Sequence, residues 1–241
     1  MEFFDEVKRL LSEVEVAEQK ALDEGARMVA ETILNGGIVH VFGTGHSHLM
    51  AEEVFCRSGG LAALNAMLEP SLMLHTGAFK TFALERMAAY AGPLLQHYDL
   101  RQGDVLIVVS NSGVTALPIE LAIQAKKRGL RTIAITSVTY SEALESSHPS
   151  GQRLHDVVDV AIDNHGIVGD AVVVLPGLDI RLGPTSTVVG VAIMHSLLIE
   201  SCRLILRAGV KPPVFLSSHL PGASTHNEKL RQQYSTRVKH F

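Results

Sequence analysis

The sequence "DVLIVVSNSGVTALPIELAIQAKKRG", residues Asp104–Gly129, contains a strand, a loop and a helix in direct succession. Its first seven residues form an apolar run of the kind that lies buried inside a parallel sheet. Pro118 stands in the first turn of the helix that follows, where proline is tolerated. Gly129 then ends the helix. This succession is one half of a strand–helix–strand unit.

The rest of the chain repeats this alternation. Further strands are predicted near residues 38–42, 61–67, 131–137 and 158–162, and a strand with a glycine-centred turn within 169–184. Helical periodicity covers residues 3–34, 82–90 and 185–209, with Gly92-Pro93 as a break and an extended tail from Pro212 to Phe241. We therefore predict an α/β fold, doubly wound, with parallel strands joined by right-handed crossovers.

Composition limits the class of protein. Of the 241 residues, 46% are hydrophobic and 19% charged, and the net charge is −4. This balance supports a buried core and lacks the basic footprint of a nucleic-acid-binding protein. Cys56 and Cys202 make neither a disulfide framework nor a metal spacing, so we expect reduced thiols in a cytoplasmic protein. The N-terminus resembles no signal peptide, and we find no apolar run of the ~18 residues that a membrane span needs.

Two loops have the composition of phosphate sites. Residues 43–48, "GTGHSH", and 110–115, "SNSGVT", each follow a predicted strand and precede a helix. In an open α/β sheet, ligands bind beyond the carboxyl ends of the strands, and a helix N-terminus favours an anion. The alternative is that the serines only cap helices and form turns. Two such loops at one sheet edge favour a ligand.

The first loop also matches the start of a dinucleotide-binding fingerprint. Gly43 and Gly45 occupy its first two glycine positions, but His48 stands where the third glycine permits close helix packing. Glu69 could mimic the acidic ribose ligand. We keep NAD binding as an alternative and expect no cofactor.

These motifs resemble the sugar isomerase (SIS) domain family. The resemblance rests on the first loop with Ser47, on "VVSNSGVTALPIELA", on the strand "RTIAITS" and on the apolar helix near 185–206. Phosphoheptose isomerases are the nearest enzymes, and "GTGHSH…AEE…RSGG" with the tail "PPVFLSSHLPGASTHN" is similar to an uncharacterised subgroup whose members are labelled isomerases. The resemblance implies a five-stranded parallel sheet between helices, a homodimer or homotetramer, and a phosphorylated sugar held by the two loops.

The resemblance also implies which residues bind the ligand. It places Ser47, Ser110, Ser112 and Thr115 at the phosphate and sugar. Three more residues of the same loops complete the expected binding set, Gly45, His46 and Asn111. We expect one domain over residues 1–241, divided into a helical arm (1–35), the α/β core (36–209) and a tail (210–241).

The catalytic pattern of phosphoheptose isomerases is matched only in part. His195 fits their helix histidine, but Arg57 stands where they have a glutamate base and Thr187 where they have a glutamine. Glu53, one helical turn before Arg57, could supply the missing carboxylate. The plain alternatives are that His195 is a core or interface residue and that Glu53 only pairs with Arg57.

Other histidines raise two further hypotheses. His46 and His48 flank Ser47, and either could reach a sugar. Together with His75, His219 and His226 they raise the question of zinc, but their spacing does not match a zinc motif and we expect no metal. The segment "SSHLPGASTHN", which contains His219 and His226, could form a lid over the site. The alternative is that this segment is a mobile tail.

Three functions compete. The first is an aldose–ketose isomerase that moves a proton through an enediol, which needs a base and a donor at the carbonyl oxygen. The second is a sensor that binds a phosphorylated sugar without turnover. The third is an etherase acting on an amino-sugar phosphate, for which Glu53 and Glu52 are the candidate acid/base groups. In each case the partner is a small phosphorylated sugar, not nucleic acid or a membrane.

Overall fold

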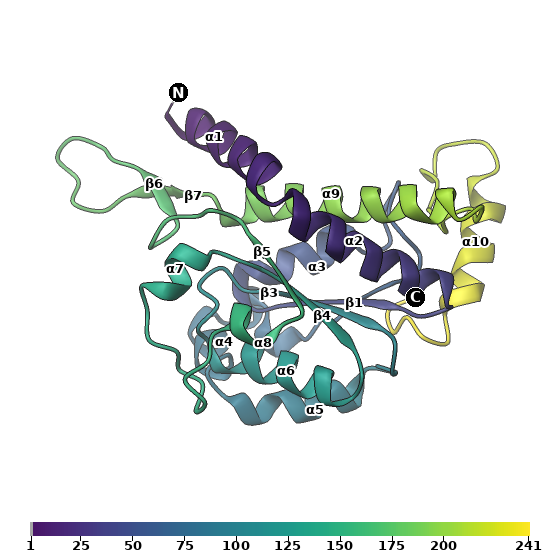
Figure 1. Ribbon diagram of the computed structural model, residues 1–241, viewed down its shortest axis with the longest axis horizontal. Coiled ribbons are helices and arrows are strands. Elements are labelled where there is room, and N and C mark those ends of the chain that lie inside the picture. The colour runs from purple at the N-terminus through teal and green to yellow at the C-terminus, as the bar shows by residue number, and fades with distance from the viewer. Residues whose placement is uncertain (1) are drawn as a thin grey trace.

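The computed structural model describes residues 2–241. Five parallel strands form one sheet in the order β2-β1-β3-β4-β5 (Figure 1). The strands are β1 (Val39–Gly43), β2 (Leu64–Ala66), β3 (Val105–Val109), β4 (Arg131–Thr136) and β5 (Val160–Asp163). The predicted doubly wound, five-stranded parallel sheet is therefore confirmed.

Helices cover both faces of this sheet because successive strand residues point to opposite sides. Val105, Ile107 and Val109 meet the layer formed by α2 (Gln19–Leu34), α3 (His48–Val54) and α9 (Ser186–Arg207). Leu106 and Val108 meet the layer formed by α5 (Ala91–His97), α6 (Ala116–Lys127) and α8 (Leu154–Val157). Both faces are buried, which explains why β3 is an unbroken apolar run.

The N-terminal helical segment is two helices, not one. α1 (Glu2–Ala17) ends one residue before Glu18, and α2 begins at Gln19 at an angle to α1 (Figure 1). The Glu18 carboxylate accepts a hydrogen bond from the backbone N–H of Asp163 at 3.1 Å and lies 3.0 Å from Nε2 of His165. The break therefore positions Glu18 against the loop that follows β5.

Three further predictions of local structure were wrong. Gly92 and Pro93 do not break a helix but lie in the first turn of α5, where the missing N–H of proline costs little. The tail contains α10 (Ala223–Tyr234), which follows Gly222. α10 is polar nearly all round and has one buried residue, Ala223, so the sequence carried no apolar stripe to reveal it. The helix predicted at 82–90 is instead α4 (Ala78–Leu84) followed by a short 3₁₀ turn at Ala88–Tyr90.

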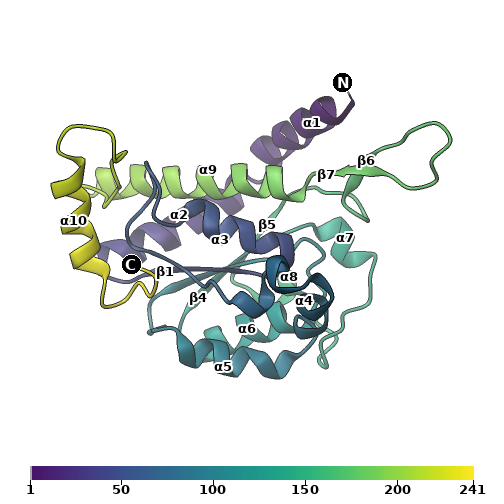
Figure 2. The ribbon, with the colours of Figure 1, turned by 180° about the vertical axis from the view of Figure 1, so that it is seen from behind.

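The remaining elements are short. 3₁₀ turns lie at Gly45–Ser47, Pro70–Leu72 and Leu74–Thr76, and α7 (Val138–Glu142) follows β4. β6 (Ala171–Val173) and β7 (Leu182–Pro184) pair as an antiparallel hairpin that projects away from the body (Figures 1 and 2).

The expectation that no apolar run is long enough for a membrane span is corrected by α9. Its 22 residues include an 18-residue window of mean hydropathy 1.7, so by length and composition it could span a membrane. Core helices of globular proteins can have the same length and apolar composition. In this structure Val189, Ile193 and Leu197 of α9 are buried in the core that α9 shares with α2, α3 and one face of the sheet.

A buried polar network joins the C-terminal segment to the amino ends of the strands. Asp104, which is 1% exposed, accepts hydrogen bonds from the backbone N–H of Ile38 at 2.9 Å and from Nη2 of Arg237 at 2.6 Å, and it lies 3.2 Å from His40. The backbone N–H of Lys239 donates to the buried Asn65 at 3.0 Å. These contacts hold residues 237–239 at the end of the sheet opposite the two predicted phosphate loops.

Candidate functional site

The two loops lie side by side where the strand order reverses. The chain leaves β1 for β2 on one side and then returns to place β3 on the other, so the β1/β3 boundary is the switch point of the sheet. Gly43 at the end of β1 pairs with Val109 at the end of β3, which places Thr44 next to Ser110. Ligands of open α/β sheets bind in the crevice at such a switch point.

Glycine is required at the start of the first loop because the chain turns back on itself. A Cβ at Gly43 would lie 2.4 Å from the carbonyl oxygen of Ser47. The turn is closed by the backbone N–H of Ser47, which donates to the carbonyl of Thr44 at 3.0 Å. Ser47 is half-buried and His46 is exposed at this turn. The glycines of "GTG" therefore shape a tight turn, and the dinucleotide fingerprint is not needed to explain them.

The second loop also depends on a glycine. Gly113 has φ +62°, and a Cβ there would lie 2.7 Å from Oγ1 of Thr136 and 3.0 Å from Oγ of Ser141. The loop thus packs directly against the last residue of β4, Thr136, and against Ser141 in the segment that follows β4. Its carbonyl at Gly113 accepts a hydrogen bond from the N–H of Leu154 at 2.8 Å. Packing from two sides fixes the path of the loop before any ligand is present.

Asn111 joins the ends of three strands. Its carbonyl accepts from the N–H of Ser137 at 2.9 Å, and its Oδ1 accepts from Nδ2 of Asn164 at 2.8 Å. Oγ of Ser137 in turn donates to the carbonyl of Gly166 at 2.6 Å. Asn111 was expected to bind the ligand, whereas the parts played by Asn164 and Ser137 were not anticipated from the sequence. Half of the Asn111 amide is used to position the loop.

The hydroxyl groups of the second loop are not used as helix caps. Thr115 is the N-cap residue of α6, but its side chain makes no capping hydrogen bond. Within residues 2–241, the hydroxyls of Ser110 and Ser112 have no hydrogen-bond partner either. Ser110 is 6% exposed, and Ser112 and Thr115 are half-buried. Three donors at the N-terminus of a 12-residue helix therefore remain available to an anion.

Glu85 is the functional candidate that sequence reasoning missed. Its carboxylate accepts a hydrogen bond from Oγ1 of Thr44 at 2.8 Å, and its carbonyl accepts from the N–H of Leu117, in the first turn of α6, at 3.0 Å. Glu85 therefore spans the two sides of the crevice. Burial raises the pKa of its carboxyl group above the usual range, although the Thr44 hydroxyl opposes this. Nothing in "FALERMAAY" distinguishes Glu85 from an ordinary surface glutamate.

His195 and Glu53 do lie together, on the outer side of the helical layer. Nε2 of His195 is 3.0 Å from Oε1 of Glu53, which Arg57 also contacts. Burial, and after it the charge of Arg57, lower the pKa of His195. The cluster is formed between α3 and α9. The ion pair between Glu53 and Arg57 that was considered as the plain alternative is present, and Glu53 also contacts His195, a pairing that was not predicted.

The lid histidines do not reach the loops within one chain. The tail from Val214 to Phe215 is held beside residues 59–61, where the N–H of Gly59 donates to the carbonyl of Phe215 at 2.9 Å. His226 lies in α10, 2.9 Å from the carbonyl of Val214. α10 is at the far end of α9 from the loops (Figure 2). The tail is thus anchored at the amino ends of the strands, and the expectation of a lid over the same chain's site is corrected.

The histidines of the first loop have separate surroundings. His48 is buried, its Nδ1 is 3.0 Å from Oε1 of Glu52, and burial lowers its pKa. Among residues 2–241, no group of three or more His, Cys, Asp or Glu side chains is arranged to hold a metal ion.

Comparison with known proteins gives the context for this site. A family model described as SIS domain matches residues 2–137. A UPF0309 protein of Geobacillus kaustophilus is 43% identical over 237 residues, which cover 98% of this chain and 94% of that protein. A UPF0309 protein of Listeria innocua is 42% identical over 236 residues, with 98% and 96% covered.

Solved structures share the fold at low identity. Phosphoheptose isomerase of Neisseria gonorrhoeae superposes with a TM-score of 0.54 at 19% identity, over 82% of this chain and 94% of that one. A phosphoheptose isomerase of Francisella tularensis gives 0.53 at 16% identity, over 83% and 95%.

Proposed function

We propose that this chain, which belongs to the SIS domain family, binds a phosphorylated sugar in the β1/β3 crevice and isomerises it between aldose and ketose forms. The observation that carries the proposal is the pair of glycine-shaped loops at the switch point, with the free hydroxyls of Ser110, Ser112 and Thr115 at the N-terminus of α6. Hydroxyl donors combined with a helix dipole suit a phosphate dianion. The solved phosphoheptose isomerases of the same fold agree with this choice of ligand class.

Binding is assigned to the residues expected from the sequence. Gly45, His46 and Ser47 form one side of the proposed phosphate site, and the second loop forms the other. The phosphate would be held by hydroxyl and backbone donors without a lysine. We expect a cytoplasmic homodimer or homotetramer that requires no cofactor and no metal.

Catalysis requires a group that removes a proton from the carbon next to the carbonyl. Two candidates are available, and they occupy different places. Glu85 lies in the crevice against Thr44, and its raised pKa brings a carboxylate closer to the working range of a general base. The His195–Glu53 pair lies between α3 and α9, and its imidazole is held largely neutral at neutral pH by its lowered pKa.

A second candidate function is supported by the same glutamate. An etherase acting on an amino-sugar phosphate needs an acid/base carboxyl group beside the sugar. Glu85 fits that need better than Glu52, whose carboxylate is 3.0 Å from His48, or Glu53, which is engaged by Arg57 and His195. The sensor alternative predicts binding without any proton exchange.

One experiment separates these functions. The protein is incubated in deuterated water with a panel of C5 to C7 sugar phosphates and amino-sugar phosphates, and the products are followed by NMR. We expect deuterium at C1 or C2 of one member of the panel. Thermal stabilisation by a sugar phosphate with no exchange across the panel would contradict the isomerase and leave the sensor. Loss of a lactyl group would identify the etherase.

Variants then assign the roles. Ser112→Ala should weaken sugar-phosphate binding about tenfold, which corresponds to one lost charge-assisted hydrogen bond of ~1.5 kcal/mol. Ser235→Ala, in the C-terminal segment, is the matched control and should bind normally. Glu85→Gln and His195→Asn should each be compared for exchange rate at saturating substrate. A variant that exchanges at the wild-type rate removes its residue from the mechanism.

A further inference from the structure

The β6–β7 arm, residues 168–184, exposes apolar side chains on a projecting hairpin. Ile180 is 70% exposed and Val174 57%, and three leucines of the arm are also exposed, Leu175, Leu178 and Leu182. The strands pair only through Ala171 with Pro184 and Val173 with Leu182. An isolated two-stranded hairpin is marginally stable in water. An exposed apolar patch of several hundred Å² marks an interaction site.

The base of the arm is nevertheless fixed to the body. The Asp170 carboxylate accepts hydrogen bonds from the N–H of Thr185 at 3.0 Å and from Oγ of Ser186 at 2.6 Å, at the start of α9. The ring of Phe3 on α1 lies so close to Gly183 that a Cβ there would be 2.7 Å from it. The arm is therefore held in a defined direction while its tip has nothing of its own chain to cover it.

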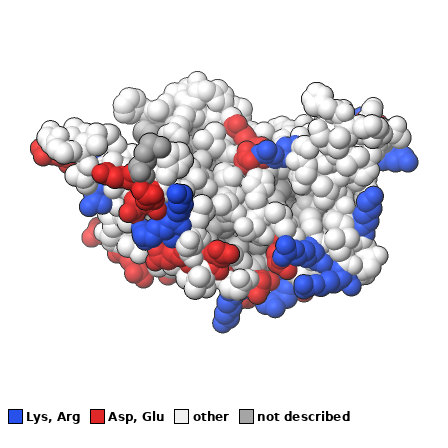
Figure 3. Space-filling model, turned by 90° about the horizontal axis from the view of Figure 1, so that it is seen from above, with Lys and Arg blue, Asp and Glu red and all other residues white. Residues whose placement is uncertain are grey.

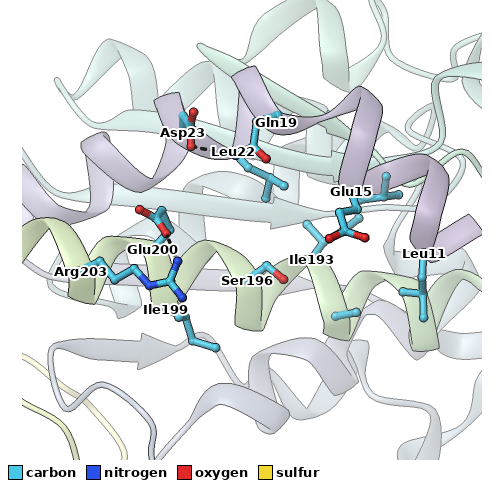
Figure 4. Close-up of a pocket in the computed structure, with 12 residues that line it drawn as sticks. Leu11, Glu15, Gln19, Leu22, Asp23, Ile193, Ser196, Ile199, Glu200 and Arg203 are labelled. Carbon is cyan, nitrogen blue, oxygen red and sulfur yellow. Dashed lines mark hydrogen bonds and ion pairs between the residues drawn. The ribbon is translucent and has the colours of Figure 1, made fainter.

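A groove between the N-terminal helices and α9 has the complementary character. It has a volume of about 480 Å³. Figure 4 shows α1 and α2 on one side and α9 on the other. Its lining includes apolar and small side chains, Leu11, Leu22, Ile193, Ser196 and Ile199. Glu200 and Arg203 of α9 also line it and form an ion pair at 2.9 Å (Figure 4). Glu15 and Asp23 stand on the side of α1 and α2, and neither carboxylate has a cationic partner within residues 2–241.

The arm and the groove belong to the same side of the molecule. In Figures 1 and 2 the arm, α1 and α9 all lie above the sheet. Seen from above, this side has a broad uncharged area, and most charged side chains gather along one edge (Figure 3). A two-fold axis lying in this surface can therefore bring each arm to the other chain's groove.

We propose that the β6–β7 arm of one chain occupies the α1–α2/α9 groove of a second copy, and that the exchange is reciprocal. The apolar tip meets the apolar side chains of the groove, and Arg181, which has no partner within residues 2–241, faces Glu15 and Asp23. If each arm and each groove contributes on the order of 400 Å², two such contacts bury roughly 1,600 Å², the size of a standard stable interface. A two-fold axis makes the contact closed and self-complementary.

Mass measurement by light scattering tests the proposal. The wild-type chain of 26.0 kDa should form an even-numbered assembly at micromolar concentration. Ile180→Asp in the arm and Ile199→Asp in the groove should each halve the mass of that assembly. Phe79→Asp is the matched control, because Phe79 is 89% exposed on α4, outside the proposed surface. Circular dichroism should show an unchanged helix content, since both isoleucines are largely exposed.

A charge exchange tests the pairing of arm with groove. Arg181→Glu and Glu15→Arg should each raise the dissociation constant at least tenfold, and the double variant should return it towards the wild-type value. A single-chain mass for the wild type, or variants that leave the mass unchanged, would overturn the proposal. Failure of the double variant to recover while the single variants dissociate would place the arm elsewhere on the partner and overturn the groove assignment. None of these outcomes depends on which ligand the loops bind.

Discussion

Gly113→Ala tests whether the second loop is held by packing against β4. The backbone at Gly113 has φ +62°, a conformation that costs an alanine ~1–2 kcal/mol. The new methyl group would also lie 2.7 Å from Oγ1 of Thr136 and 3.0 Å from Oγ of Ser141. Relieving that overlap in a packed site costs a further ~1–3 kcal/mol. We therefore expect a loss of about 2–5 kcal/mol in the free energy of unfolding, using both contributions.

Calorimetry can separate the two contributions. For a chain of this size, each kcal/mol lowers the melting temperature by about 2–4 °C, so Gly113→Ala should melt roughly 4–20 °C lower. Gly151→Ala is the matched control, because Gly151 also has positive φ, +71°, but nothing lies within 4 Å of its Cβ position. It should lose only the conformational part.

Ligand binding gives a second measurement. Displacement of the loop at Gly113 should abolish stabilisation by sugar phosphates, whereas the control should retain it. If Gly113→Ala melts no lower than Gly151→Ala, packing against β4 does not hold the loop in the shape proposed for the phosphate site.

Three further predictions concern charged side chains. Asp104→Asn should cost ~3–5 kcal/mol in urea unfolding at pH 7, because it leaves Arg237 without its buried partner. Burial raises the pKa of Asp104, but hydrogen bonds from His40, Ile38 and Arg101 outweigh this and bring the pKa below the usual value. The wild type should therefore lose this stability as the pH falls below ~4, and the stability difference between wild type and Asp104→Asn should shrink at pH 3. Glu85 has a raised pKa, so its carboxylate destabilises the fold as the pH rises; Glu85→Gln should gain stability relative to wild type between pH 4 and pH 8, and an unchanged difference would contradict this. Glu18→Ala should lower the melting temperature by several degrees, since one loop N–H and His165 lose their partner; equal melting would show that the break between α1 and α2 does not depend on Glu18.

Much of the fold could be predicted from the sequence because its central strands are mainly apolar and buried on both faces. Asp104–Ser110 and Arg131–Ser137 have no alternation, which is typical of strands buried on both faces, and both lie in the centre of the sheet. Reasoning from apolar patterns failed for the elements whose burial leaves no apolar pattern in the sequence. α10 is polar around its circumference, and the division at Glu18 depends on a contact with β5 that is 145 residues away in the chain.

The site was predictable only as far as chain order determines it. Both serine loops follow strands, so their meeting at one edge followed from parallel topology. Glu85 could not be found in this way, because its role depends on a hydrogen bond to Thr44 across 41 residues and on burial that raises its pKa. The position of the tail was missed for the opposite reason. His219 and His226 are close together in sequence, but Arg237 and Lys239 hold the tail at the other end of the sheet.

The separation of the two proton-transfer candidates has a structural cause. Met50, Ala51 and Val54 fill the side of α3 that faces the sheet, so Glu53 must point outward towards α9. Six residues of helix also separate Ser47 from Glu53, which is about 9 Å along the axis. A sugar phosphate anchored at the serine loops of one chain can therefore contact Glu85 directly, but it meets the helical layer before it meets His195. If turnover requires Glu85 but not His195, the active site is complete within one chain. If turnover also requires His195, a second chain must complete the active site. Mixing Glu85→Gln chains with His195→Asn chains should then restore an exchange that neither variant shows by itself.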